Sequence, residues 1–107
     1  MADVSRNRSE TRLPERANIR TVKELQPELL AALLGGDAVV LDITACREVD
    51  FSFVQMIEAA RLYARVAGKT LTLSAPAEGA VLDVLRRAGF LDQVSPEHAS
   101  FWLHREV

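Results

Sequence analysis

A carboxylate and a hydroxyl stand two residues apart where an apolar strand is expected to lead into a helix, at Asp50 and Ser52. Ser52 could accept a phosphate that the free backbone amides of the helix start would stabilise. We favour a second role, in which its hydroxyl caps the helix by accepting a hydrogen bond from one of those amides. Asp50 is expected to orient the loop or to cap the same helix. The stretch Val49–Val54 is therefore the expected functional corner of the molecule.

The other reactive side chains lack the neighbours that catalysis needs. Cys46, His98 and His104 belong to no motif that pairs a nucleophile with a base. The two histidines are six residues apart, which does not place them on one helical face as metal ligands. Gly35-Gly36 follows a predicted helix, so it is not a phosphate-binding loop. We predict no metal, no cofactor and no enzymatic activity, and a small-ligand binder or enzyme is the less favoured alternative.

The composition indicates one soluble domain. Of the 107 residues, 49% are hydrophobic, which is enough for a packed core and argues against disorder. The net charge of −2 argues against nucleic-acid binding. No apolar run approaches the roughly 18 residues of a membrane span, and no secretion leader is visible. The single cysteine cannot form an internal disulfide. These features predict a cytoplasmic protein without direct membrane insertion.

Hydrophobic periodicity predicts strands that alternate with helices. Residues 1–11 are polar and are expected to form a flexible tail, so the predicted domain spans residues 12–107. The predicted elements are, in order, an edge strand at Arg12-Leu13-Pro14, a helix from Asn18 or Thr21 to Gly35, a strand over Ala38–Thr44, a helix over Ser52–Ala67, a strand over Thr70–Ser74, a helix over Ala80–Ala88 that Gly89 stops, and a short helix after Ser95.

This order predicts an α/β fold with a central, mostly parallel sheet of about four strands and helices packed on it. The strand Ala38–Thr44 is apolar on both faces apart from Asp42, which is typical of a strand covered by helices on both sides. Binding sites in such sheets lie beyond the carboxyl ends of the strands. The loop Ala45–Asp50 follows one of those ends, in agreement with a site at the corner.

Helix termini carry recognisable signals. Thr21 and Glu24 have the spacing of a capping box, and Pro27 is expected to kink the first helix or delay its regular part. Ser95-Pro96 is typical of a helix start. The final helix should bring Phe101-Trp102-Leu103 against the domain itself, or less favourably against another chain.

The second helix is expected to be amphipathic. Its buried face should include Phe53 and Ile57, and a row with Met56, Tyr63 and Val66 should widen that face. The opposite stripe should be solvated, with an ion pair on the surface between Glu58 and Arg61. This polar stripe consists of Gln55, Glu58, Arg61 and Arg65.

The combination of these pieces, in order and spacing from Ala38 to Asp92, resembles the STAS family, the small domains of anti-sigma factor antagonists that also occur in sulfate transporters. The matching pieces are the apolar strand Val39–Ile43 with its internal Asp42, the loop residue Asp50, the helix residues Val54, Met56, Ile57, Ala59 and Ala60, the glycine and strand Gly68–Leu73, and the third helix with Ala80-Val81, Val84-Leu85 and Gly89-Phe90.

The sequence departs from the family at the phosphorylation loop. In phospho-regulated members the residue after the Asp is the phosphorylated serine or threonine, and here it is Phe51. Ser52 occupies the next place, and Phe53 stands where a glycine is usual. The amino-terminal part is also short, as in compact STAS proteins of chemotaxis clusters or lipid-transport ABC systems. The resemblance therefore implies a switch that is lost or shifted, with Ser52 as the remaining candidate phosphoacceptor.

The resemblance implies a protein-binding module in which the loop and the following helix meet a partner, such as an anti-sigma factor with a histidine-kinase-like ATPase fold. Phe51 and Phe53 are either aromatic anchors for that partner or core residues under the loop. A STAS partner in a chemotaxis cluster and an accessory subunit of a lipid-transport ABC system are the alternatives. We expect a monomer or a weak homodimer. The predicted partner-binding residues are Asp50, Phe51, Ser52, Phe53, Gln55 and Met56.

Overall fold

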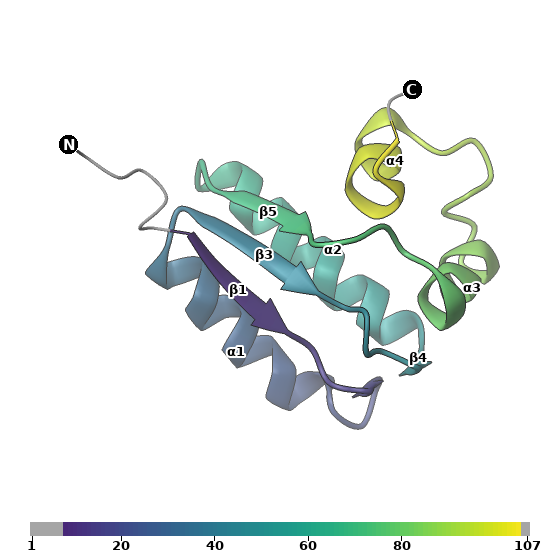
Figure 1. Ribbon diagram of the computed structural model, residues 1–107, viewed down its shortest axis with the longest axis horizontal. Coiled ribbons are helices and arrows are strands. Elements are labelled where there is room, and N and C mark those ends of the chain that lie inside the picture. The colour runs from purple at the N-terminus through teal and green to yellow at the C-terminus, as the bar shows by residue number, and fades with distance from the viewer. Residues whose placement is uncertain (1–7, 106–107) are drawn as a thin grey trace.

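Three parallel strands form the sheet of the protein, and a computed structural model describes it over residues 8–105. The strands are β1 (Arg8–Arg12), β3 (Ala38–Asp42) and β5 (Thr70–Leu73), in the order β1-β3-β5 (Figure 1). The predicted α/β fold with a parallel sheet is confirmed, with three strands instead of about four. A separate parallel pair joins the two-residue strands β2 (Arg16–Ala17) and β4 (Glu48–Val49).

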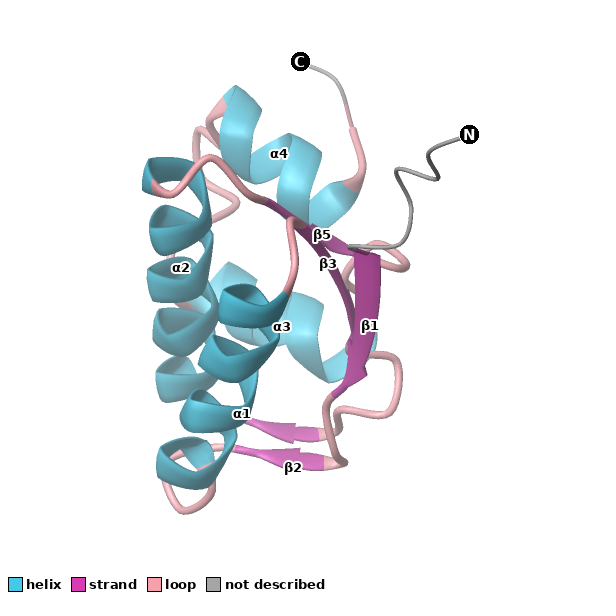
Figure 2. Cartoon of the chain, turned by 90° about the vertical axis from the view of Figure 1, so that its left-hand side faces the viewer, coloured by secondary structure: helices cyan, strands magenta, loops and turns pink. Residues whose placement is uncertain are grey.

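Four helices lie mainly on one side of this sheet (Figure 2). They are α1 (Val22–Gly35), α2 (Phe51–Val66), α3 (Gly79–Arg87) and α4 (Pro96–Leu103). The first two pack beside each other, α1 against β1 and β3, and α2 against β5. Since the strands are parallel, α1 and α2 run in the same direction, and their first turns lie at the same end of the molecule.

The two faces of the sheet differ in burial. Val39, Leu41, Leu71 and Leu73 point toward the helices and are buried. The alternate residues of the same strands are exposed or half-buried, and Val40 is among the half-buried ones. The prediction that the central strand is covered on both sides was therefore wrong. Apolar residues at its alternate positions reflect the high strand propensity of valine as well as burial.

The first strand begins earlier than predicted. Residues 8–11 were assigned to a flexible tail, but they belong to β1 and pair in register with β3 from Arg8 opposite Ala38 onward. Strand pairing uses backbone groups, so an edge strand can form from polar residues that show no hydrophobic pattern. The part of the predicted tail over residues 1–7 lies outside the described residues. Leu13, expected in the edge strand, follows β1 and is buried.

The helix-start predictions had mixed outcomes. No side-chain cap from Thr21 is formed at α1, so the predicted capping box was wrong. The Thr21 hydroxyl instead accepts from the Asn18 N–H at 3.0 Å and donates to the Arg16 carbonyl at 3.0 Å, which closes the turn before the helix. The Ser95 start is confirmed, because its hydroxyl accepts from the His98 N–H at 3.1 Å.

The last helix packs against its own domain. Phe101 and Trp102 of α4 are buried in the core, as the favoured prediction stated. The Trp102 carbonyl also accepts a 2.7 Å hydrogen bond from the Ala77 N–H, which joins α4 to the segment before α3. At the end of α3, Gly89 has a φ of +85°, a conformation that glycine adopts easily, and the predicted stop is confirmed. Across residues 8–105, no helix has both the length and the apolar character to cross a membrane.

Candidate functional site

Asp50 fixes the corner at the start of α2. One carboxylate oxygen, Oδ1, accepts hydrogen bonds from the Ser52 N–H at 3.0 Å and from the Ser52 hydroxyl. The other, Oδ2, accepts from the Ile19 N–H at 3.0 Å. Asp50 is thus the N-cap of α2 and also ties it to the turn before α1, so it performs both of its predicted roles. The prediction that Ser52 caps the helix was wrong, because Ser52 lies one residue inside it.

The same contacts keep Asp50 ionised. Burial alone would raise the pKa of this carboxyl group. Hydrogen bonds from the Ser52 hydroxyl and from the N–H groups of Ile19, Phe53 and Ser52 outweigh burial, so the pKa lies below its usual value. A stable negative charge at the N-terminus of α2 also interacts favourably with the helix dipole.

A short ribbon supports this corner from the other side. The β2–β4 pair places Arg16 opposite Glu48 and Ala17 opposite Val49, directly before Asp50. The Glu15 carbonyl accepts from the N–H groups of Arg47 and Glu48, at 2.9 and 3.0 Å. The sequence did not predict this ribbon, since strands of two residues leave no periodic signal.

The two phenylalanines of the loop have opposite environments. Phe53 has no exposed surface, and the centre of its ring lies 6.4 Å from the centre of the Trp102 ring, so Phe53 belongs to the core. Phe51 keeps 51% of its surface exposed. Phe51, with Val49 and Asp50, forms one wall of an open groove of about 430 Å³, and the end of α3 forms the other. The α3 wall consists of Val84, Arg87 and Ala88.

The six predicted partner-binding residues therefore do not share one surface. Phe51 and Gln55 are exposed, and Asp50 and Ser52 are half-buried beside them. The side chain of Phe53 is buried in the core, and Met56 is buried apart from the part that lines a small hollow between α1 and α2. Binding through the four accessible residues stays a prediction.

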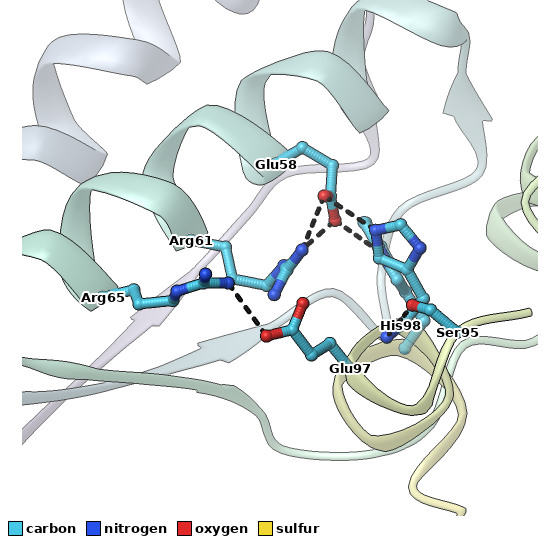
Figure 3. A network of polar contacts seen from close by, with 7 residues as sticks. Glu58, Arg61, Arg65, Ser95, Glu97 and His98 are labelled. Atoms are coloured by element: carbon cyan, nitrogen blue, oxygen red, sulfur yellow. Dashed lines mark hydrogen bonds and ion pairs between the residues drawn. The ribbon is translucent and has the colours of Figure 1, made fainter. Parts of the chain in front are cut away.

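Glu58 is the centre of a network that the sequence did not reveal (Figure 3). Its Oε1 lies 2.9 Å from Arg61 Nη2 and 3.1 Å from His98 Nε2, and its Oε2 accepts from Trp102 Nε1 at 2.9 Å. The side chains of Glu58 and Arg61 are only 22% and 19% exposed. The guanidinium of Arg61 also lies 5.7 Å from the centre of the Phe101 ring. The network therefore binds α2 to α4.

This network corrects the prediction for the polar stripe of α2. The expected pair between Glu58 and Arg61 forms, but α4 covers it instead of leaving it in solvent. Gln55 and Arg65 are exposed as predicted, and Arg65 forms an exposed ion pair with Glu97 at 2.8 Å. The partners of Glu58 lie 40 and 44 positions away, so no local pattern could have found them.

Hydrogen bonds to Glu58 outweigh its burial. Burial would raise the pKa of this carboxyl group. The Arg61 guanidinium, the Trp102 indole N–H and His98 together hold the pKa below its usual value. Glu58 therefore carries a full charge in the folded protein near neutral pH.

The remaining candidates for chemistry lie apart from one another. Cys46 is buried, and this burial, followed by the nearby charge of Asp42, raises the pKa of its thiol to about 11. His104 Nε2 lies 3.1 Å from the Leu73 carbonyl oxygen. In the part of the chain that the structure describes, no three histidine, cysteine, aspartate or glutamate side chains gather as a possible metal site.

The fold is a small parallel α/β domain whose exposed corner is a capped helix start. A protein-family model described as "Mlab, STAS domain" matches residues 2–95, so the chain belongs to the STAS domain family. The match begins inside the segment that was predicted to be a tail. STAS domains mediate protein–protein interactions and are generally non-catalytic binding modules. Searches of curated proteins and of solved structures found no significant match.

Proposed function

We propose that this protein is a non-catalytic protein-binding module of a bacterial-type signalling or regulatory system, similar to an anti-sigma factor antagonist, and that it acts in the cytoplasm. The partner is a protein such as an anti-sigma factor with a histidine-kinase-like ATPase fold. The observation that carries the proposal is the half-exposed Phe51 at the family's switch position, on a backbone that Asp50 holds in place.

Phe51 is suited to anchor a partner. Aromatic side chains that become buried at the centre of an interface contribute a large share of binding energy. The groove beside Phe51 offers further apolar surface from the half-buried Val49 and a charged group from Arg87. The hydrogen bonds of Asp50 hold the corner before a partner arrives, which lowers the entropy lost on binding.

The usual phosphorylation switch is proposed to be lost. Phe51 has no hydroxyl, and the Ser52 hydroxyl is half-buried and donates to Asp50. A phosphate on Ser52 would add nearly two negative charges next to the Asp50 carboxylate and would break that hydrogen bond. The loss of this hydrogen bond disfavours phosphorylation at the shifted position, so partner binding is constitutive or regulated elsewhere.

Replacing Phe51 tests the anchor. Phe51→Asp should abolish pull-down of the partner encoded beside the gene, because a charge would have to be buried in the interface. Thr72→Asp, on the exposed sheet face, is the matched control and should bind as the wild type does. Both variants should unfold at the urea concentration of the wild type to within the error of the measurement. Unchanged binding of a folded Phe51→Asp protein would refute the proposed anchor.

Phosphorylation is tested separately. The protein is incubated with ATP and the kinase encoded nearest to it, and mass spectrometry then locates any phosphate. We expect none on Ser52, with Ser52→Ala as the control for a signal elsewhere. Phosphate on Ser52 together with loss of partner binding would show a shifted switch and constitutive binding would be rejected.

The two strands described before α1 support a second setting. In residues 8–21, only β1 and the two-residue β2 precede α1. Compact STAS proteins of this kind also act as accessory subunits of lipid-transport ABC systems or within chemotaxis clusters. Co-purification of the tagged protein with the ATPase of an ABC transporter, and not with a kinase, would favour the transport setting.

A further inference from the structure

The large exposed hydrophobic side chains gather on two neighbouring helices. Each such residue within residues 8–105 belongs to α1, to α2 or to the turn before α1. The open face of the sheet and helices α3 and α4 contribute none of them over the same described range. These residues are Ile19, Leu30, Leu34, Phe51, Leu62 and Val66. Apolar side chains that concentrate on one side of a small domain mark an interaction surface.

Along α2, Phe51, Leu62 and Val66 lie in one row that runs the length of the helix and also contains Ala59 and the polar Gln55. Phe51, Gln55, Ala59, Leu62 and Val66 follow at intervals of three or four residues, and all five are exposed. This spacing places them on one face of the helix. We call this set the α2 stripe. It extends the proposed docking corner at Phe51 continuously along α2, because Phe51 is its first member.

A hollow deepens the surface between α1 and α2. Its volume is about 150 Å³, and Ala59, Ala60 and Tyr63 of α2 line it opposite Gln26 and Leu30 of α1. An engineered apolar cavity of about 150 Å³ in another protein holds benzene, so a hollow of this size accepts one leucine or phenylalanine side chain. Because Ala59 belongs both to the α2 stripe and to the lining of the hollow, the hollow extends this surface from α2 toward α1.

The end of this surface near Phe51 is positively charged. Arg87 lines the groove beside Phe51. The carboxylate of Asp83 lies 3.1 Å from Arg87 and 3.8 Å from Arg86, so the two arginines share one negative charge. Arg20, also exposed, follows Ile19 at the start of α1. Asp50 lines the same groove and is ionised, so the three arginines face the two carboxylates of Asp50 and Asp83, which leaves a net positive charge at this end.

We propose that the α2 stripe and the α1–α2 hollow together receive an amphipathic helix of the partner protein, lying along α2 with acidic residues at the end that meets Arg87. Apolar residues at positions i, i+4, i+7 and i+11 of that helix match the stripe, and one of them fills the hollow. This inference rests on the proposed protein-binding function and adds the occupant's structure and charge. The area is extended and nearly straight, which fits a helix better than a loop.

The probe is a fluorescein-labelled peptide of about 16 residues, with leucines at i, i+4, i+7 and i+11, three glutamates in its first turn and glutamine or alanine elsewhere. Glutamates in the first turn also stabilise the peptide's own helix. A second peptide carries lysines in place of the glutamates. Fluorescence anisotropy gives the affinity, and amide chemical shifts of the labelled protein locate the bound peptide.

Two alanines provide a matched pair of protein variants. Ala59 lines the hollow, whereas Ala31 is an exposed alanine of α1 that does not line it. Ala59→Glu should weaken binding of the acidic peptide by about tenfold or more, and Ala31→Glu by less than about twofold, since a charge buried in the hollow should cost at least the roughly 1.4 kcal/mol that corresponds to tenfold. The lysine peptide should bind at least about fivefold more weakly than the acidic one, as charge complementarity requires.

Several outcomes would overturn the inference. These are absence of saturable binding of the acidic peptide, equal losses for Ala59→Glu and Ala31→Glu, and shifts confined to residues outside α1 and α2. Sedimentation that shows a dimer dissociated by Ala59→Glu would assign the surface to a second copy instead. If Phe51→Asp abolishes pull-down of the partner but Ala59→Glu does not, docking is limited to the corner. In that case the proposed function stands and only this inference fails.

Discussion

The two faces of α2 that point away from the sheet show the reverse of the usual arrangement. The face with Glu58 and Arg61 is polar, yet α4 covers it. The face with Leu62 and Val66 is apolar, yet it is open to solvent. In an isolated domain a polar face normally faces water and an apolar face is buried. The polar face therefore serves the fold, and the apolar face is the one that we propose for a partner.

The covered face is stable because its polar groups all find partners. No described side-chain nitrogen or oxygen is both buried and without a hydrogen-bond partner. Trp102 brings an indole N–H to Glu58, and its ring contacts Phe53 and Phe101 in the core. Apolar packing and satisfied hydrogen bonds therefore act together at this face. The open face has no such partners within the described chain.

Trp102→Ala should have the largest effect on this comparison. It removes a side chain that is 1% exposed and leaves the Glu58 carboxylate without its indole donor. We expect the free energy of unfolding to fall by about 3–5 kcal/mol, measured by urea denaturation. Leu62→Ala on the open face is the control, with a change of about 0.5 kcal/mol or less. Similar losses for the two variants would contradict the distinction between the faces.

Glu58→Ala should have the next largest effect. The Trp102 indole N–H, buried in the core, would lose its acceptor, and Arg61 would lose its ion pair. An unsatisfied buried donor costs about 1–3 kcal/mol of unfolding free energy. Glu97→Ala breaks the exposed pair with Arg65 and should cost at most about 1 kcal/mol. If Glu97→Ala were as damaging as Glu58→Ala, the network in Figure 3 would have no special role in the fold.

The fold was largely predictable because its signals are local. The strand before the corner, the helix that ends before Gly68, and the cap at Ser95 each depend on residues close together in sequence. The edge strand β1 was predicted too late in the chain, because pairing with β3 satisfies its backbone without an apolar pattern. The pair β2–β4 was missed because two residues carry no periodicity.

The candidate site was only partly predictable. The sequence located the corner at Asp50 and the aromatic at Phe51, since the family resemblance marks that loop. Helix periodicity placed Phe53 on the buried face, which the structure confirms, but the sequence did not decide whether Phe51 is buried. The burial of Glu58 depends on α4, whose His98 lies 40 positions later in the sequence. A polar residue is assigned to solvent by default, and only the tertiary structure shows the exception.

Lowering the pH should weaken the covered face. The pKa of Glu58 is lower in the folded protein than its usual value near 4.5, so the folded state binds fewer protons in this range. Its stabilising contribution is present above that usual value and is lost as the pH falls through the lower, folded-state pKa. Glu58→Gln should therefore lose less unfolding free energy than the wild type between pH 7 and pH 3, measured by urea denaturation. The contributions of Asp42 and Asp50 are common to both proteins and cancel in this difference.

The smallest effect is expected at the far end of the open face. Val66, in the last turn of α2, is 80% exposed, so Val66→Lys removes little buried surface. Lysine also has a higher helix propensity than valine and interacts favourably with the helix C-terminus. The free energy of unfolding should stay within about 0.5 kcal/mol of the wild type at any protein concentration. A loss above 1 kcal/mol that grows with protein concentration would mean that a second copy covers this face in solution. An unchanged value leaves the apolar face free for a different protein.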